Sequence, residues 1–268
     1  MSVVAFVFMR LDWPDQARVL SQLVAGESVL ALCLKRAARI KDVDLVVSLL
    51  PQAHLYDELA EISGDCGAMV VRGPGEDLLG LFLKAARESE AEHILAIEAT
   101  SPFLDPGLCR HVLKLYRESA VDYATNDMPA GFPDGLSCHA FSREILAYAD
   151  RQVRTPSARA HPIDWLRTYP PLQKANLTGP GGGLERLRWR VVFDEDVTFA
   201  RAVYEAMNHR GYGEKRTPWD LSAAELAGLC LRRPDLVHIN QAWINEARLA
   251  NRLCADINSA PVQFMHAA

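Results

Sequence analysis

Two short stretches hold polar residues whose types and spacing suit the binding of a ligand or an ion. Glu98, Thr100 and Ser101 directly follow an apolar run, and ligands of open α/β sheets bind at the carboxyl ends of such strands. Asp194 and Asp196 are two residues apart, so on an extended segment both carboxylates would face the same way, as metal ligands do. Alternatively, the hydroxyl pair and the two aspartates only cap the helices that follow them.

Three arginines stand where strands are expected to end. Arg10 and Arg18 lie in the polar segment after the first apolar run, and Arg72 precedes Gly73 after another. A cation at the carboxyl edge of a sheet is placed to contact a ligand. For Arg72 the alternative is a solvated strand terminus.

An alternation of strands and helices would position these residues. Apolar runs predict strands and amphipathic patterns predict helices between them. The expected strands are residues 3–8, 45–50, 69–71 and 94–97, and the expected helices are residues 28–40, 54–63 and 76–90. The unbroken run at residues 94–97 is typical of a central strand buried on both faces. This order predicts an α/β fold with a mostly parallel sheet and helices on both faces.

The second half of the chain continues the pattern less regularly. We expect a sheet edge at residues 122–124, strands at 138–141 and 188–192, and helices at 107–119, 142–153, 199–207 and 221–231. Ser142 and Asp220 are the expected N-caps of two of these helices. The glycine-rich residues 177–184 lack the order of a phosphate-binding loop and predict a flexible loop. Residues 1–240 therefore predict one α/β domain, and residues 241–268 a C-terminal helical tail.

The composition limits the class of protein. A chain of 268 residues with 49% hydrophobic residues can build a large core, and its net charge of -5 argues against a duplex nucleic-acid partner. The first apolar run is too short for a membrane span. Six cysteines without metal-site spacing predict a reduced, cytoplasmic protein that has neither disulfides nor structural zinc.

Six separated segments follow the order of one known family. They are residues 71–87, 98–106 (EATSPFLDP), 132–136 (FPDGL), 157–161 (SARAH), 188–205 (RWRVVFDEDVTFARAVYE) and 221–240, which ends RRPDLVHIN. Together they resemble the acylneuraminate cytidylyltransferase family, and especially its branch of spore coat polysaccharide biosynthesis. The similarity is patchwise but spans most of the chain.

The resemblance implies a Rossmann-like, GT-A-like nucleotidyltransferase. Such an enzyme would transfer CMP from CTP to a hydroxyl of an acidic sugar or a related small acceptor, would release pyrophosphate, and would form a homodimer. Phosphoryl transfer rests on positioning and charge, so cations hold the triphosphate and carboxylates hold Mg²⁺. The implied roles are catalysis and nucleotide binding for Arg10 and Arg18, nucleotide binding for Arg72, Glu98, Thr100 and Ser101, acceptor binding for Asp134, Arg159 and His161, and Mg²⁺ binding for Asp194 and Asp196. We expect Arg10, Arg72, Thr100 and Asp194 to share one cleft.

Some of these residues have simpler interpretations, and the chain departs from the family's pattern. Asp134 could only set a Pro-Asp-Gly turn, and residues 157–161 could be a solvated loop. Arg18 stands where the family has a lysine, which is no neutral exchange at a phosphate. Thr100 takes the place of a metal-binding Asp of the spore coat branch. An ungapped match puts Val192 at the second such position, whereas a gapped match aligns residues 193–196 with Phe-Asp-x-Asp, and the sequence leaves both open. A catalytically degenerate subunit that binds nucleotide or a partner is therefore the alternative function.

Overall fold

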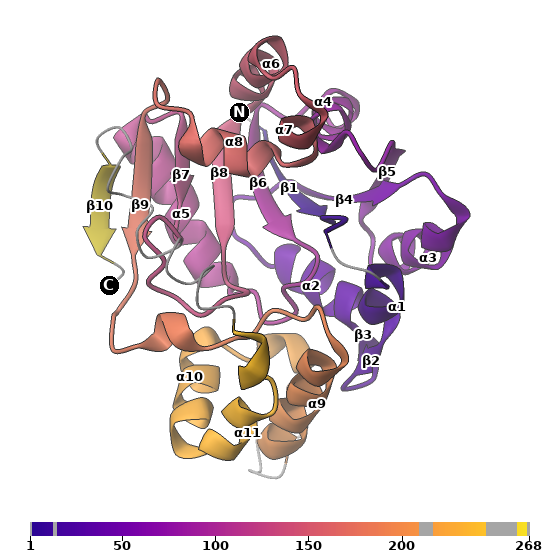
Figure 1. Ribbon diagram of the computed structural model, residues 1–268, viewed down its shortest axis with the longest axis vertical. Coiled ribbons are helices and arrows are strands. Elements are labelled where there is room, and N and C mark those ends of the chain that lie inside the picture. Colours follow the sequence, from indigo (N-terminus) through magenta and orange to yellow (C-terminus); the bar gives the residue numbers. More distant parts are fainter. Residues whose placement is uncertain (1, 13–14, 209–216, 245–261, 267–268) are drawn as a thin grey trace.

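One mixed β-sheet forms the centre of the molecule (Figure 1). The computed structural model describes residues 2–12, 15–208, 217–244 and 262–266. In this part of the chain the sheet has eight strands in the order β10-β9-β7-β8-β6-β1-β4-β5, and only β8 runs antiparallel to its neighbours. The strands are β1 (Val3–Phe8), β4 (Leu45–Pro51), β5 (Met69–Gly73), β6 (His93–Glu98), β7 (Tyr123–Thr125), β8 (Cys138–Ser142), β9 (Lys174–Thr178) and β10 (Val262–His266). A small hairpin is formed by β2 (Leu23–Val24) and β3 (Glu27–Ser28).

Helices cover both faces of this sheet, because the central strands bury side chains on both sides. All six residues of β1 are buried, and β6 is buried from Ile94 to Ile97. One face packs against α1 (Gln16–Ser21), α2 (Val29–Ala37), α3 (Asp57–Asp65), α5 (Pro106–Ser119), α9 (Asp194–Asn208), α10 (Ala223–Arg232) and α11 (Pro234–His238). The other packs against α4 (Leu78–Glu88), α6 (Arg143–Gln152), α7 (Pro156–Ala160) and α8 (Pro162–Thr168). The predicted α/β fold is confirmed, with β6 as a central strand.

Local signals explain where several helices begin. Ser142 caps α6 as predicted, since its hydroxyl accepts a hydrogen bond from the Ile145 amide at 3.2 Å. The carboxylate of Asp105, rather than the Thr100 and Ser101 hydroxyls, caps α5. The prediction that Asp220 caps the 221–231 helix is wrong. Asp220 ends the 3₁₀ turn η3 (Pro218–Asp220), and Ser222 caps α10 with Glu225 in a capping box.

The structure corrects three further expectations about strands. Residues 123–125 form β7 inside the sheet and not at its edge, because β9 and β10 lie beyond it. The strand β9, with the polar sequence KANLT, was not predicted. Residues 188–192 join no strand of the sheet, and only a single bridge links Arg188 to Asp134.

The end of the chain differs in part from the predicted helical tail. Residues 241–243 form the 3₁₀ turn η4 (Gln241–Trp243), while most of the predicted helix, and Cys254, lie outside the described residues. Residues 262–266 form β10, which pairs parallel with β9. Within the described ranges, no helix is long and apolar enough to cross a membrane.

Candidate functional site

The candidate site lies at the carboxyl ends of β1 and β6, which run side by side. Phe8 and Glu98, the last residues of these strands, are partners in the parallel register. Arg10 follows two residues after Phe8, just beyond the end of the strand. Its Nη1 atom lies 4.0 Å from Oε1 of Glu98. We call the residues gathered here the Arg10 cluster: Arg10, Asp12, Glu98, His161, Asp164 and Arg190.

The Arg10 guanidinium is the centre of this cluster. Its Nε donates to Asp12 at 2.7 Å, and its Nη2 donates to Asp164 at 3.2 Å. Nη2 also lies 3.2 Å from Nδ1 of His161. Burial lowers the pKa of Arg10, but the carboxylates of Asp164 and Asp12 outweigh this effect and raise the pKa above its usual value. Arg10 is thus a fixed cation beside His161, which the family resemblance assigns to acceptor binding.

Glu98 lies between two guanidinium groups. Besides Arg10, it forms an ion pair with Arg190, whose side chain is only 5% exposed. The Thr100 hydroxyl donates to Glu98 at 3.5 Å. The Thr100 carbonyl accepts a hydrogen bond from the Val191 amide at 2.8 Å, which ties the segment carrying Arg190 to the turn after β6. Thr100 is itself buried at this turn.

The loop after β7 holds the Arg190 segment from the other side. The Trp189 amide donates to the carbonyl of Asp134 at 2.7 Å. Gly135 has a φ of +108°, and a Cβ there would lie 2.6 Å from the Arg190 nitrogen. Glycine is therefore required at this contact. Asp134 does set a turn, and its carboxylate also lies 3.7 Å from Arg188.

Asp194 and Asp196 do not lie on an extended segment. Both belong to the first turn of α9, so the prediction that their carboxylates face the same way is wrong. Asp194 is exposed and accepts two hydrogen bonds from Arg18, at 2.9 and 3.1 Å, which lower the pKa of Asp194 below its usual value. Asp196 is fully buried. Arg18 and Asp194 thus form a separate surface pair.

The Asp196 carboxylate is saturated by protein donors. It accepts two hydrogen bonds from Arg188, at 2.8 and 2.7 Å, and one from each of the Val192 and Phe193 amides at 3.0 Å. The Asn240 amide group adds another at 2.9 Å. With these partners, Asp196 is a structural hydrogen-bond acceptor that caps the start of α9. Asp194 and Asp196 therefore do not fit a shared Mg²⁺ ion, and the described part of the chain has no group of three or more His, Cys, Asp or Glu side chains that could hold a metal ion.

The remaining predicted residues have partners outside the Arg10 cluster. Arg72 donates to Asp57 at 2.6 Å and to two backbone carbonyls near the end of β4. Arg159 binds Asp77 and Asp150, at the start of α4 and on α6. Ser101 is buried, and its carbonyl accepts the Leu104 amide within the turn. The structure therefore brings together Arg10, Glu98, Thr100 and His161, and it does not bring Arg72, Arg159 or Asp194 to them.

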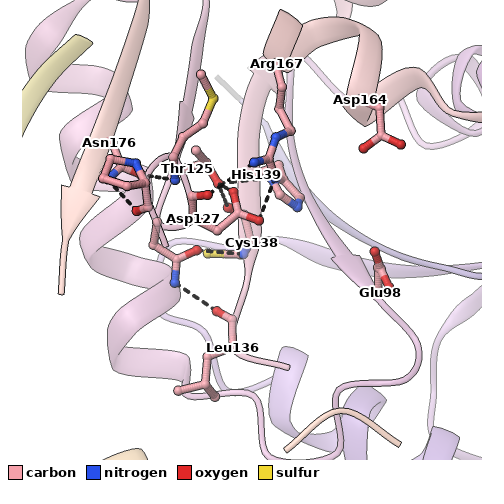
Figure 2. A network of polar contacts seen from close by, with 12 residues as sticks. Glu98, Thr125, Asp127, Leu136, Cys138, His139, Asp164, Arg167 and Asn176 are labelled. Carbon is pink, nitrogen blue, oxygen red and sulfur yellow. Dashed lines mark hydrogen bonds and ion pairs between the residues drawn. The ribbon is translucent and has the colours of Figure 1, made fainter. Parts of the chain in front are cut away.

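A buried polar network lies beside the cluster, at the carboxyl end of β7 (Figure 2). The Thr125 hydroxyl lies 2.9 Å from Oδ1 of Asp127, and Arg167 of α8 donates to Oδ2 of Asp127 at 2.7 Å. His139 of β8 places Nδ1 3.0 Å from the Thr125 hydroxyl and 2.8 Å from that of Tyr123. Burial lowers the pKa of His139 to about 4. The imidazole is therefore neutral near neutral pH.

Two asparagines extend this network and hold the loop after β7. Asn126 donates to the Leu136 carbonyl at 2.9 Å and accepts from the Cys138 amide at 3.0 Å. Asn176 of β9 accepts from the Met128 amide at 2.8 Å. Both side chains are essentially buried. The loop between β7 and β8 is thus held by Asn126, the first residue after β7, and by Asn176 of β9.

Sequence reasoning missed several members of the site. Arg190 lies in the alternating run RWRVV, and His139 interrupts an apolar run. Both were visible as polar residues in expected strands, which is a signal that sequence reasoning could have used. Asp164 and Arg167 lie on α8, a short helix that carried no recognisable motif.

Comparison with known proteins finds a relative by sequence. The chain is 25% identical over 198 residues to the spore coat polysaccharide biosynthesis protein SpsF of Bacillus subtilis (strain 168). The match covers 73% of this chain and 78% of SpsF. No protein-family model matches the sequence.

Solved structures share the fold. A cytidylyltransferase from Leptospira borgpetersenii serovar Hardjo-bovis (strain JB197) has a TM-score of 0.76 and 18% identity, and covers 88% of this chain and 95% of its own. A CMP:2-keto-3-deoxy-manno-octonic acid synthetase in complex with CTP has a TM-score of 0.55 and 13% identity, covering 77% and 100%. Rv0371C of Mycobacterium tuberculosis H37Rv, in complex with manganese, has a TM-score of 0.53 and 14% identity, covering 75% and 99%.

These findings confirm the resemblance drawn from the sequence. The sequence match relates the chain to SpsF, and the structural matches give it the cytidylyltransferase fold. One protein of this fold binds CTP and another binds a divalent metal.

Proposed function

Because the chain is related to SpsF and has the fold of the cytidylyltransferases, we propose that it is a nucleotidyltransferase that uses CTP. The observation that carries the proposal is the meeting of Arg10, Glu98 and Thr100 with His161 at the carboxyl ends of β1 and β6. Residues that the sequence assigned to the nucleotide and to the acceptor thereby adjoin at the edge where such sheets bind ligands.

In the proposed reaction, a hydroxyl oxygen of the acceptor forms a bond to the α-phosphorus of CTP. The bond from that phosphorus to the bridging oxygen of the β-phosphate breaks, pyrophosphate leaves, and the proton of the hydroxyl group goes to water. Arg10 would exchange its contacts with Asp12 and Asp164 for phosphate oxygens, since guanidinium binds both groups in the same geometry. Arg190 supplies a second cation close by. For Arg18 and Arg72, which pair with Asp194 and Asp57, the nucleotide-binding role stays a prediction.

We assign Mg²⁺ to the substrate, as the counter-ion of CTP, and to no site among the residues that the structure describes. Asp196 is saturated and Asp194 is bound to Arg18, so neither fits a shared metal ion. An acidic sugar as the acceptor, with Asp134 and Arg159 as further binding residues, and a homodimer both rest on the family resemblance. Light scattering at a defined protein concentration would test the dimer against the monomer mass.

Calorimetry with CTP and an assay of pyrophosphate release test the proposal. The acceptors are 2-keto-3-deoxy-manno-octonic acid and N-acetylneuraminic acid, each with CTP and Mg²⁺. We expect Arg10→Ala to weaken CTP binding by about tenfold or more, the loss of one charge-assisted contact. Arg110→Ala is the matched control, because Arg110 of α5 forms only an exposed ion pair, with Asp42. A wild-type protein that neither binds CTP nor releases pyrophosphate would contradict the proposal.

The second candidate is a family member that binds nucleotide without catalysis. It is favoured by Thr100, which takes the place of a metal-binding aspartate of the spore coat branch, and by Val192, which takes the second such place in the ungapped match. Such a protein would bind CTP and release no pyrophosphate with any acceptor. An active wild type excludes it.

A further inference from the structure

Glu98, at the carboxyl end of β6, is a carboxylate at the edge where the proposed function places a triphosphate. One of its oxygens, Oε1, lies 4.0 Å from Nη1 of Arg10, and the other, Oε2, forms an ion pair with Nη2 of Arg190. Like charges repel strongly where water is excluded, so a carboxylate beside a triphosphate needs a cation that neutralises it. The groups around Glu98 determine which cation this is.

A protein-bound metal ion does not fit this place. Among the residues that the structure describes, Glu98 belongs to no group of three or more His, Cys, Asp or Glu side chains that could hold a metal. Asp196, which the resemblance assigned to Mg²⁺, is saturated by Arg188 and by backbone amides. Asp194 is held by Arg18. The two carboxylates assigned to the ion are thus engaged with arginines.

The backbone on both sides of Arg190 is fixed at this edge of the sheet. The Val191 amide donates to the carbonyl of Thr100, in the turn after β6, at 2.8 Å. The Trp189 amide donates to the carbonyl of Asp134 at 2.7 Å. The guanidinium of Arg190 therefore reaches Glu98 from a segment that is held in place on either side.

The two arginines differ in how firmly their carboxylate partners are held. Asp12 and Asp164, which pair with Arg10, have side chains that are 27% and 50% exposed, so each can turn to water when a phosphate arrives. The side chain of Arg190 is only 5% exposed, and that of Glu98 is 18% exposed. Separating this pair would leave a buried charge uncompensated, which is costly. Arg190 and Glu98 therefore stay together when a ligand binds to Arg10.

We propose that Arg190 takes the place of a protein-bound metal ion, because its guanidinium neutralises Glu98 and lets a triphosphate bind beside this carboxylate. The inference rests on the proposed function and adds that CTP binding does not require a divalent metal. Arg10 contacts the phosphates, and Arg190 is a positioning residue that acts on them through the charge of Glu98. The Mg²⁺ that accompanies CTP stays a counter-ion of the phosphates and bridges no carboxylate of this cluster.

Calorimetry with CTP, in Mg²⁺ and in EDTA, tests the inference without turnover. Arg190→Met keeps an unbranched side chain at the buried position and removes the charge. We expect the wild-type Kd to differ by no more than about threefold between the two conditions, and Arg190→Met to bind CTP in EDTA about tenfold more weakly than the wild type. Mg²⁺ should restore most of this loss, because the ion then neutralises Glu98. Arg110→Met, at an exposed pair with Asp42, is the matched control and should behave as the wild type.

Glu98→Gln gives a prediction of the opposite sign, which does not depend on the folding of Arg190→Met. The substitution removes the carboxylate and leaves the charge of Arg190 to attract phosphate, so CTP in EDTA should bind about threefold more tightly. If Glu98 held a metal ion, the same substitution would weaken the binding of CTP in Mg²⁺. The double variant Arg190→Met/Glu98→Gln should lose the dependence on Mg²⁺, since no carboxylate remains to be neutralised.

The outcomes separate this inference from the proposed function. A wild type that binds CTP but needs Mg²⁺ as strongly as Arg190→Met does overturns the inference alone, and so does weaker binding of CTP to Glu98→Gln. If Arg190 were merely structural, Arg190→Met would lower the thermal midpoint of unfolding and weaken CTP binding equally in Mg²⁺ and in EDTA, which also overturns the inference. A wild type that binds CTP in neither condition contradicts the proposed function as well.

Discussion

At the scale of single residues, the carboxyl edge of the sheet is a set of arginine–carboxylate pairs. Arg10 holds Asp12 and Asp164, and Arg190 holds Glu98. Each guanidinium is therefore already oriented, so little side-chain entropy is lost when a phosphate replaces a carboxylate. The replacement also has a cost, because the released carboxylate must find water or another donor.

The saturated carboxylate of Asp196 leads to a stability prediction. Asp196→Asn removes the charge that compensates the buried guanidinium of Arg188, and we expect a loss of about 3 to 5 kcal/mol in the free energy of unfolding. Urea unfolding measures it. Asp194→Asn, at an exposed site, is the control and should change stability little. If Asp196 were instead a metal ligand, its substitution would leave stability intact and weaken the response to Mg²⁺.

Buried His139 predicts a pH dependence of stability. Its pKa falls from 6.5 to about 4 because burial disfavours the charged ring, so the unfolded chain binds the proton more tightly. The contribution is therefore fully present above pH 6.5, and it is lost as pH falls toward 4, by about 3 kcal/mol in all. Urea unfolding at pH 7.5 and pH 5.0 should show about 2 kcal/mol more loss in the wild type than in His139→Phe. Equal losses in both proteins would contradict a buried neutral ring.

Sequence reasoning recovered those site residues that directly follow a strand or belong to a motif. Arg10 and Glu98 follow the apolar runs of β1 and β6, and His161 was found through the SARAH segment. Asp164 and Arg190 were missed, because their role depends on partners far away in the sequence. The pairing of Arg18 with Asp194 and of Arg72 with Asp57 was hidden for the same reason.

At the scale of elements, the first half of the fold was predictable because its strands are continuous apolar runs. The strand β9 was not predicted, because its sequence KANLT is polar. Its buried Asn176 hydrogen-bonds to the Met128 amide of the loop after β7. The extended segment at residues 188–192 has the alternation of a strand but hydrogen-bonds to the turn at Thr100 and the loop at Asp134. Periodicity shows that a segment is extended and cannot show which partner it has.

The helix starts offer a test of how elements are joined. Asp105 accepts from the Leu108 amide at 3.0 Å as the cap of α5, and its other oxygen accepts from the Ala223 amide at 2.9 Å at the start of α10. We expect Asp105→Ala to cost about 2 kcal/mol of unfolding free energy, because two helix ends lose a partner. Ser222→Ala, which removes one cap, should cost about 1 kcal/mol. Urea unfolding that ranks the two substitutions in the opposite order would show that Asp105 does not join these helices.

At the scale of the whole molecule, the Arg10 cluster exists only when distant parts of the chain have come together. Arg10 contacts Asp164 and His161, which follow it by 154 and 151 residues. These contacts join the loop after β1 to α8, across the face of the sheet that α4 and α6 also cover. A ligand of this cluster therefore binds the folded chain and not the unfolded one.

Selective binding to the folded state predicts that CTP raises the thermal midpoint of unfolding. At about a hundredfold excess over its Kd, a ligand adds about 2.7 kcal/mol, which for a chain of this size is a shift of roughly 5 °C or more. Arg10→Ala should lose most of this shift, whereas Arg110→Ala should keep it, because Arg110 pairs with Asp42 at an exposed site outside the cluster. Differential scanning fluorimetry with CTP, UTP, ATP and GTP at equal concentration measures the shift and the base preference together. A shift that survives Arg10→Ala and disappears in Arg72→Ala would move the triphosphate from the end of β1 to the end of β5.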